Sequence, residues 1–292
     1  MCEHTKTSPE GLWDALNRME VSASLLLDRK LAPFEAPLRS CYEAGVQAPT
    51  LEAKRQHEPD MLYAALFLKR ALNDLRSVWI LTQTGYTSQA ASVAAALFEH
   101  ALAATCLGGS MRRVSELEAN KSGDLPWGAQ ALSMMLARRW QREAQEDGKP
   151  FGQDEYEKAW REVYSGYKWL CKIKHPTLRS VSHDAFAASA KSDQYVVMAA
   201  PDVRDEDLAV KATVLMICFS RVYEAIRQFA RALDCDEGVE YCRDFEARLD
   251  AAHSGAIEAY KTLAQRPLPF DIRDSPLARE WAGMKRKSHS EH

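Results

Sequence analysis

Residues 160–183, WREVYSGYKWLCKIKHPTLRSVSH, contain the side chains best suited to act together chemically. If most of this stretch is helical, a phenol, a thiol and an imidazole share one helix face at four-residue spacing, supplied by Tyr164 or Tyr167, Cys171 and His175. A cysteine nucleophile needs a base within hydrogen-bond reach and a third group that orients the base. Cys171 and His175 would supply the first two groups, although on a single helix the backbone blocks one side of such a pair.

Glu99 lies in the middle of residues 87–107, whose small side chains on every face predict a buried helix. An unpaired carboxylate in such a helix would cost several kcal/mol, so Glu99 needs a partner. The candidates are His175, Arg76, Arg70 and a tyrosine hydroxyl. We therefore predict a polar cluster of Glu99, Tyr167 and His175, with His183 as a further candidate. The cluster either fixes helix packing or forms a ligand pocket, and both interpretations stay open at this point.

Two groups of arginines could bind an anionic partner. Arg112 and Arg113 form one group, and the other is Arg138, Arg139 and Arg142 with Trp140 among them. Clustered cations beside an aromatic side chain are typical of nucleic-acid binding. Acidic residues follow the second group directly, and the formal net charge of the chain is -3. A solvated helix face is therefore the simpler interpretation, with RNA binding as the alternative.

The common spacings of metal and cofactor sites are missing from the sequence. It has no glycine-rich phosphate loop, no His-Glu-x-x-His and no Gly-x-Ser-x-Gly. A helical di-iron site needs Glu-x-x-His pairs on two helices, whereas Glu99 and His100 are adjacent. The 7 cysteines are odd in number and none is spaced Cys-x-x-Cys. We predict no metal site, no cofactor and reduced thiols in the cytoplasm.

Bulk composition is that of an ordinary globular protein. The 292 residues are 46% hydrophobic and 27% charged, which excludes a disordered chain and a strongly basic nucleic-acid coat protein. The N-terminus lacks the pattern of a secretory signal. Residues 87–107 are the best candidate for a membrane span, but Glu99 and His100 at their centre argue against it. We expect a cytoplasmic protein that does not contact a membrane.

Helices are the elements that must position these side chains. Apolar residues recur at three- and four-residue steps, most clearly in residues 207–233, where they form a heptad seam. Only residues 194–199 have extended character, which allows at most one short strand. We predict one all-α domain over residues 1–265, with about eight or nine mostly antiparallel helices, followed by a proline-containing, mixed-charge tail over 266–292. The expected helices cover residues 9–31, 34–43, 59–84, 87–107, 111–119, 126–146, 154–175, 207–233 and 237–263.

The heptad seam could pack inside the chain or form a two-fold contact between copies. It consists of Leu208, Ala212, Leu215, Phe219, Val222, Ile226, Phe229 and Leu233. Packing inside the chain is the default interpretation. We nevertheless expect a homodimer, because a seam of this length exceeds what one packing contact needs.

Residues 70–107 and 164–177 resemble a loose group of uncharacterised all-helical bacterial proteins near the HEPN superfamily. The matching positions are Gly85, Tyr86, Glu99, Tyr167, Cys171, His175 and Pro176. Several HEPN proteins are RNases of toxin–antitoxin and phage-defence systems, and their signature is an arginine followed by a histidine four to six positions later. Arg248 and His253 fit this spacing, so the resemblance implies that they would act on an RNA phosphodiester without a metal.

Three functions are therefore expected, and whether the chain is an enzyme stays open. The leading one is a protein-interaction module, with the resemblance pointing to bacterial stress or phage defence. The first alternative is a metal-independent, toxin-type RNase that uses Arg248 and His253, or the groove of Glu99 and His175. The second alternative is a small-ligand-binding protein whose pocket lies between residues 87–107 and 154–175 and is lined by Tyr164, Tyr167 and Trp169.

Overall fold

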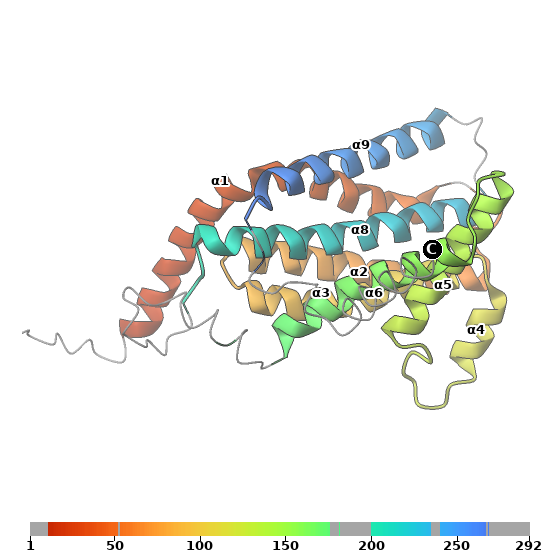
Figure 1. Ribbon diagram of the computed structural model, residues 1–292, viewed down its shortest axis with the longest axis horizontal. Helices are drawn as coiled ribbons and strands as arrows, with labels where there is room; N and C mark the ends of the chain where they lie inside the picture. Colours follow the sequence, from red (N-terminus) through yellow and green to blue (C-terminus); the bar gives the residue numbers. More distant parts are fainter. Residues whose placement is uncertain are drawn as a thin grey trace, which may run out of the picture.

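A computed structural model describes residues 11–51, 53–175, 181, 200–234, 240–266 and 268. In this part of the chain it shows a packed bundle of eight α-helices and two short 3-10 helices, with no strand, which confirms the predicted all-α fold (Figure 1). The elements are α1 (Leu12–Gln47), η2 (Ala48–Thr50), α2 (Pro59–Gln83), α3 (Thr87–Leu107), α4 (Met111–Glu118), α5 (Ala129–Glu146), α6 (Gln153–Lys174), η4 (Asp205–Asp207), α8 (Leu208–Leu233) and α9 (Glu240–Leu263). Residues 194–199, His183 and nearly all of the tail lie outside the described residues.

The first two predicted helices are one continuous helix, which corrects the predicted break between residues 31 and 34. Helix α1 continues through Pro33 and Pro37. A proline removes one helical hydrogen bond. Here Phe34, Pro37 and Leu38 are buried between neighbouring helices, and this packing keeps the helix continuous. The N-terminal turns of α1 extend beyond the bundle (Figure 1).

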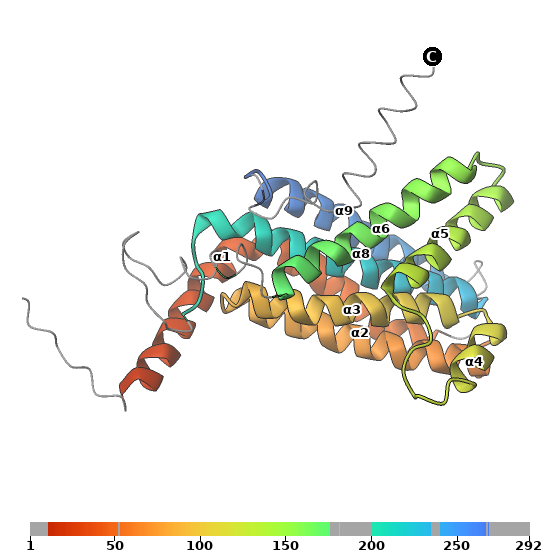
Figure 2. The same ribbon diagram turned by 60° about the horizontal axis from the view of Figure 1, so that its bottom comes forward.

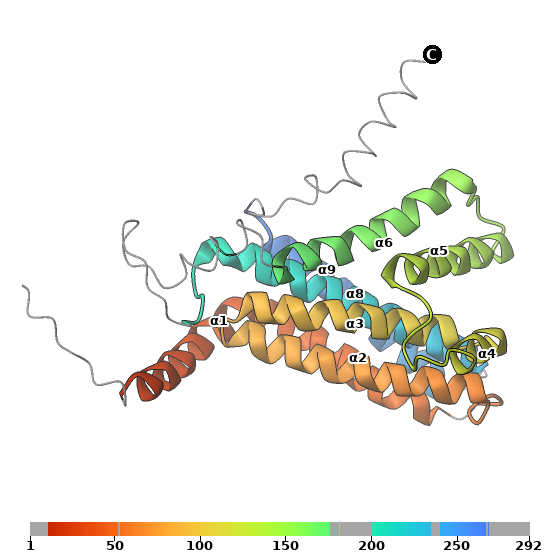
Figure 3. The ribbon, with the colours of Figure 1, turned by 90° about the horizontal axis from the view of Figure 1, so that it is seen from below.

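Helices α2 and α3 form an antiparallel pair (Figure 3). Gly85 turns the chain between them with a φ of 85°, and an added Cβ there would lie 2.8 Å from Pro201 Cβ. Helix α3 packs against α2, α5, α6 and α8 through alanines on several faces. By length and composition α3 could cross a membrane, yet 67% of its apolar window is buried inside the bundle.

The heptad seam of α8 is buried within the chain. Seven of its eight residues are buried and Leu208 is partly so, because α8 packs against α1, α2, α3 and α9. The seam is therefore not free to form a contact between copies, and the expected homodimer stays a prediction. At the start of α8, Lys211 and Asp207 form a fully buried ion pair. Thr87 at the start of α3 donates a hydrogen bond of 2.5 Å to the same Asp207 carboxylate.

Helices α5 and α6 form a second antiparallel pair, which lies across α3 (Figure 2). Ala137, Tyr156 and Trp160 make a small apolar cluster between these two helices, separate from the main core. Helix α4 is short and packs against α2 and α3. The last turns of α3 and α8 therefore lie close to α4 and α5.

Candidate functional site

Glu99 and Tyr167 are brought together as predicted from the sequence. The Tyr167 hydroxyl donates a hydrogen bond of 3.2 Å to Glu99 Oε1 across the α3–α6 contact. The Tyr167 ring lies 5.3 Å from the ring of Phe98 and 6.0 Å from that of Tyr164. Burial, together with neighbouring Cys171 and Glu99, raises the pKa of Tyr167 above its ordinary value. The phenol therefore stays protonated and acts as a hydrogen-bond donor.

Two other candidates for that cluster, His175 and Arg76, have different surroundings from Tyr167, and His183 lies outside the described residues. His175 is exposed and follows the last residue of α6, where the backbone is already extended, so it no longer continues the helix face of Tyr167. Arg76 lies in a groove beside α1, with Glu35, Arg39 and Tyr42. Trp169 is buried at 1% exposure, and it lines neither the cleft beside α4 and α5 nor the pocket between α6 and α8.

Asp74 on α2 pairs with two basic side chains, His100 on α3 and Arg70 on α2. His100 Nδ1 lies 2.7 Å from Asp74 Oδ2, and Arg70 lies 3.7 Å from Asp74 Oδ1. Arg70, considered from the sequence as a partner for Glu99, therefore pairs with its own helix.

Arg248 and His253 contact different helices. Arg248 is exposed and donates a hydrogen bond of 2.9 Å to Gln47 Oε1 at the end of α1. His253 faces α8, where its ring stacks on Tyr223 with the centroids 4.3 Å apart. Burial lowers the pKa of His253, which favours a neutral imidazole. The two side chains therefore have different neighbours, and their role as an RNase pair stays a prediction.

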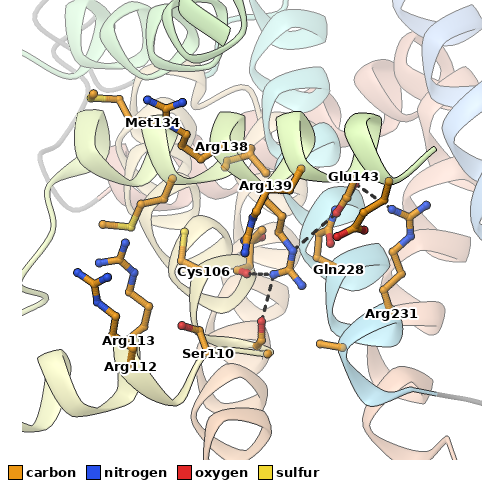
Figure 4. A pocket seen from close by; sticks show the side chains of 18 of the residues that line it. Cys106, Ser110, Arg112, Arg113, Met134, Arg138, Arg139, Glu143, Gln228 and Arg231 are labelled. Atoms are coloured by element: carbon orange, nitrogen blue, oxygen red, sulfur yellow. Dashed lines mark hydrogen bonds and ion pairs between the residues drawn. The ribbon is translucent and has the colours of Figure 1, made fainter. Parts of the chain in front are cut away.

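A cleft of about 1060 Å³ opens where α3 and α8 end beside α4 and α5 (Figure 4). Seven arginines and four acidic residues line it. The arginines are Arg55, Arg112, Arg113, Arg138, Arg139, Arg142 and Arg231. In Figure 4, Arg112 and Arg113 rise from α4, while Arg139 reaches toward the end of α3 from α5. The two arginine groups singled out from the sequence therefore line the same space.

The local sequence explains this convergence. Helix α3 ends at Gly108, and Gly109, with a φ of 82°, turns the chain directly into α4. This turn places Arg112 and Arg113 beside the end of α3. On α5, Arg142 lies four residues after Arg138 and three after Arg139, and these two spacings place side chains next to each other on a helix.

Arg139 and Arg55 are fixed by backbone carbonyls. Arg139 Nη1 donates hydrogen bonds of 2.5 Å to Thr105 O and 3.1 Å to Gly108 O, which supplies donors to the C-terminal end of α3. Burial lowers the pKa of Arg139, and the nearby charge of Glu143 opposes this effect. Arg55 donates to Ala232 O at 2.9 Å and to the fully buried Asp60 at 2.8 Å.

The remaining cations of the cleft are less constrained. Arg112 and Arg113 share Glu116, at 3.0 Å and 2.5 Å. Arg142 is exposed and has no hydrogen bond or ion pair within the part of the chain that the structure describes. Arg142 is therefore free to approach an anion, whereas exposed Arg112 would share its guanidinium between the anion and Glu116.

One lining acceptor is left without a donor. Gln228 is 1% exposed, and its Nε2 donates to Glu224 Oε1 at 2.9 Å. Its Oε1 is buried and accepts no hydrogen bond from the residues that the structure describes. A buried amide oxygen without a partner costs free energy, so a ligand donor or an ordered water would be favourable there.

Reactive groups are scarce in the cleft. Burial raises the pKa of the Cys106 thiol to about 12, against small opposing effects of Arg139 and Arg113. The thiol is thus protonated and a poor nucleophile. No histidine is among the described residues that line the cleft. Within the described ranges, no three His, Cys, Asp or Glu side chains form a group that could hold a metal ion.

Sequence reasoning missed Arg55, Arg231 and Gln228. Arg55 lies in a charged loop and the other two lie on α8, where the heptad pattern was the dominant signal. Arg139 was interpreted as part of a solvated face, but its side chain is only 18% exposed. No local signal in the sequence distinguishes it from Arg138 and Arg142.

Comparisons with known proteins add no relative: no family model, no curated protein and no solved structure matches the chain. The similarity to HEPN proteins therefore stays a prediction from the sequence.

Proposed function

We propose that this chain is a small-ligand-binding protein whose arginine-lined cleft holds a phosphate-bearing molecule. The observation that carries the proposal is the convergence of arginines from α4, α5, α8 and the loop before α2 on one cleft. Arginine presents several N–H donors in a fixed plane, which matches the oxygens of a phosphate group. Ser110, which precedes α4, also lines the cleft, so the positive end of that helix adds to the favourable potential.

The cleft favours binding over catalysis. A volume of about 1060 Å³ corresponds to a small molecule with several functional groups. The unpaired Gln228 Oε1 suits a ligand that has a hydroxyl or amino donor beside its phosphates. The protonated Cys106 offers no activated nucleophile. A phosphorylated ligand with hydrogen-bond donors, such as a nucleotide, combines these features.

Isothermal titration calorimetry with ATP and with inorganic pyrophosphate tests the proposal. The variant R112Q/R142Q removes one cation from each wall of the cleft and leaves Arg139 in place. The control R39Q/R243Q removes two exposed arginines from α1 and α9. We expect the cleft variant to bind at least about tenfold more weakly than wild type, because charge-assisted hydrogen bonds contribute about 1.5–3 kcal/mol each. The control should bind as wild type does.

Equal binding by both double variants, or no binding of either probe to wild type, would overturn the proposal. Single-stranded RNA of about twelve nucleotides serves as a third probe, since such strands suit grooves lined by cations and aromatics. If RNA bound much more tightly than ATP and with the same dependence on Arg112 and Arg142, the cleft would be part of a nucleic-acid surface instead.

A second candidate function, protein interaction, is favoured by the N-terminal turns of α1. Trp13, Val21 and Leu25 are exposed at 71%, 62% and 62% in the N-terminal half of α1. Large exposed apolar side chains grouped on one element are typical of contact surfaces. Light scattering on the full chain and on W13S/L25S measures whether these residues support self-association. If the full chain and the variant had the same mass in solution, Trp13 and Leu25 would not form a contact between copies.

A further inference from the structure

A second, smaller pocket lies between α6 and α8. It measures about 380 Å³ and shares no lining residue with the arginine-lined cleft. Its walls are mainly apolar, with Phe98 from α3, Trp140 from α5, Val163 from α6 and Ile217 from α8. Ser220 and Arg221 are its polar contributions from α8, and Glu162 lies at its α6 side. Mainly apolar walls with a few polar groups are typical of small-molecule pockets.

Arg221 is partly buried and has no charged partner among the described residues. Its Nη1 atom is buried and has no hydrogen bond, and the guanidinium makes no hydrogen bond or ion pair with the described residues. It lies 6.0 Å above the ring of Phe98. Burial lowers the pKa of Arg221, and the charges of Glu224 and Glu162 oppose this effect. An unpaired buried charge is costly, so an anion in the pocket would be favoured.

The nearby carboxylates do not supply that anion. Glu224 is engaged elsewhere: it accepts hydrogen bonds from Trp140 Nε1 at 2.7 Å, Arg227 Nη2 at 3.0 Å and Gln228 Nε2 at 2.9 Å. Glu162 is exposed on α6 and forms no ion pair with Arg221. The positive charge in the pocket is therefore uncompensated by a direct contact.

Gly166 keeps the pocket open on the side of α6. A glycine inside a helix is less favourable than alanine by about 1 kcal/mol. A Cβ built at Gly166 would first meet Ile217, at an ordinary contact distance of 3.7 Å. Steric crowding of the backbone therefore does not require a glycine here. A larger side chain at this position would occupy the pocket itself.

We propose that this pocket binds a small carboxylate with an apolar body, whose carboxylate pairs with Arg221. The apolar body would pack against Phe98 and Ile217, where burial of apolar surface contributes to affinity. A single arginine matches the single charge of a carboxylate in a two-pronged contact. A phosphate dianion fits less well, because its second charge would stay unpaired among apolar walls. This inference does not depend on the proposed function of the cleft.

Ligand-observed NMR titration of the full chain tests the proposal with 3-phenylpropionate and 4-methylpentanoate. The neutral amide 3-phenylpropanamide is the matched control ligand. We expect a carboxylate to bind with a Kd of about 1 mM or tighter, the affinity that small ligands of this size reach in a fitting pocket. The amide should bind at least about tenfold more weakly, because it cannot form the charge-assisted pair.

Two variants separate the charge from the space. R221M removes the guanidinium, and G166L fills the pocket while keeping Arg221. Each should weaken carboxylate binding at least about tenfold, whereas R142Q in the cleft should leave it unchanged. If R221M does not fold, G166L and the amide comparison still decide. The proposal is overturned if neither carboxylate binds to wild type, if acid and amide bind equally, or if either folded R221M or G166L binds as wild type does.

Discussion

The cleft and the pocket use arginine in opposite ways. In the cleft, Arg139 and Arg55 are half-buried and donate to backbone carbonyls, so their charges help to hold the ends of α3 and α8 in place. In the pocket, Arg221 is partly buried, and its buried Nη1 has no hydrogen bond or ion pair among the described residues. A buried guanidinium thus stabilises a fold when its donors are used, and destabilises it when they are not. The first arrangement holds helix ends in place, whereas in our proposal the second gains its partner from a ligand.

Glu224 joins the two regions. Its carboxylate accepts from Trp140, which lines the pocket, and from Gln228, which lines the cleft. Helix α8 supplies Arg221 to one region and Arg231 to the other. Both sites therefore depend on α8 and on Glu224. The difference between their arginines thus comes from the immediate surroundings of each side chain.

The largest expected effect is on the cleft side. R139M should lower the free energy of unfolding by about 3 kcal/mol, because the carbonyls of Thr105 and Gly108 lose their donor and stay buried. Urea denaturation measures this value. R142M, which removes an exposed arginine of the same helix, should leave the stability unchanged. If R139M lowered the free energy of unfolding by less than about 1 kcal/mol, water would be replacing the guanidinium as donor. That result would contradict the structural role of Arg139.

The junction should give a pH-dependent effect. Burial acts to raise the pKa of Glu224, but the charge of Arg227 and the hydrogen bonds from Arg227, Gln228 and Trp140 outweigh it, so the net pKa is lowered. A lowered pKa in the folded state contributes stability that is present above the ordinary value of 4.5 and is lost as the pH falls through the folded value. Wild type should therefore lose more stability than E224Q on acidification from about pH 7 to about pH 3. If urea denaturation showed that wild type and E224Q lose the same stability on acidification, this role of Glu224 would be contradicted.

The Glu99–Tyr167 pair should give a smaller and purely structural effect. Y167F removes one hydrogen bond of 3.2 Å to a half-buried carboxylate and should lower stability by about 1 kcal/mol. Thermal unfolding followed by circular dichroism measures this change. Binding of ATP and of 3-phenylpropionate should be unaffected. A change in either affinity without a change in stability would give the pair a functional role instead.

The smallest expected effect is a difference in the salt dependence of ligand binding between the cleft and the pocket. The cleft is open and its free arginines are exposed, so raising the salt from about 50 mM to about 500 mM should weaken ATP binding several-fold. Arg221 is partly buried with its Nη1 inside the pocket, so a carboxylate paired with it is more shielded from mobile ions. Binding of 3-phenylpropionate should therefore change much less over the same range. Equal salt dependence would place the carboxylate at the cleft or on the surface.

The fold was largely predictable from the sequence because helical periodicity is a local signal. The seam from Leu208 to Leu233 and the small-residue faces of α3 follow from spacing and side-chain size alone. The continuous α1 was not predicted, because prolines at 33 and 37 suggest a break and only the burial of Phe34 and Leu38 overrides it. At the predicted polar cluster, the position where α6 ends decides which side chains continue its Glu99-facing side. Tyr167 reaches Glu99 from within α6, while His175 lies just past its last residue.

The cleft and the pocket were not predictable in the same way. Arg55, Arg112, Arg139 and Arg231 come from four separate segments, and only the packing of α4 and α5 over the end of α3 brings them together. Arg221 lies inside the α8 heptads, where the pattern indicates which residues are buried but not which charges are paired. Convergence and charge pairing are tertiary properties, so spacing along one helix carries no information about them.

The free energy of unfolding of R221M, measured without ligand against wild type, tests the contrast between the two regions most directly. Methionine keeps most of the volume of the side chain and removes its buried charge. We expect R221M to be more stable than wild type by about 1 kcal/mol, since replacing an unpaired, partly buried charge by an apolar side chain is favourable. A loss of about 1 kcal/mol or more would contradict this account, because it would mean that the guanidinium already has partners that stabilise the fold.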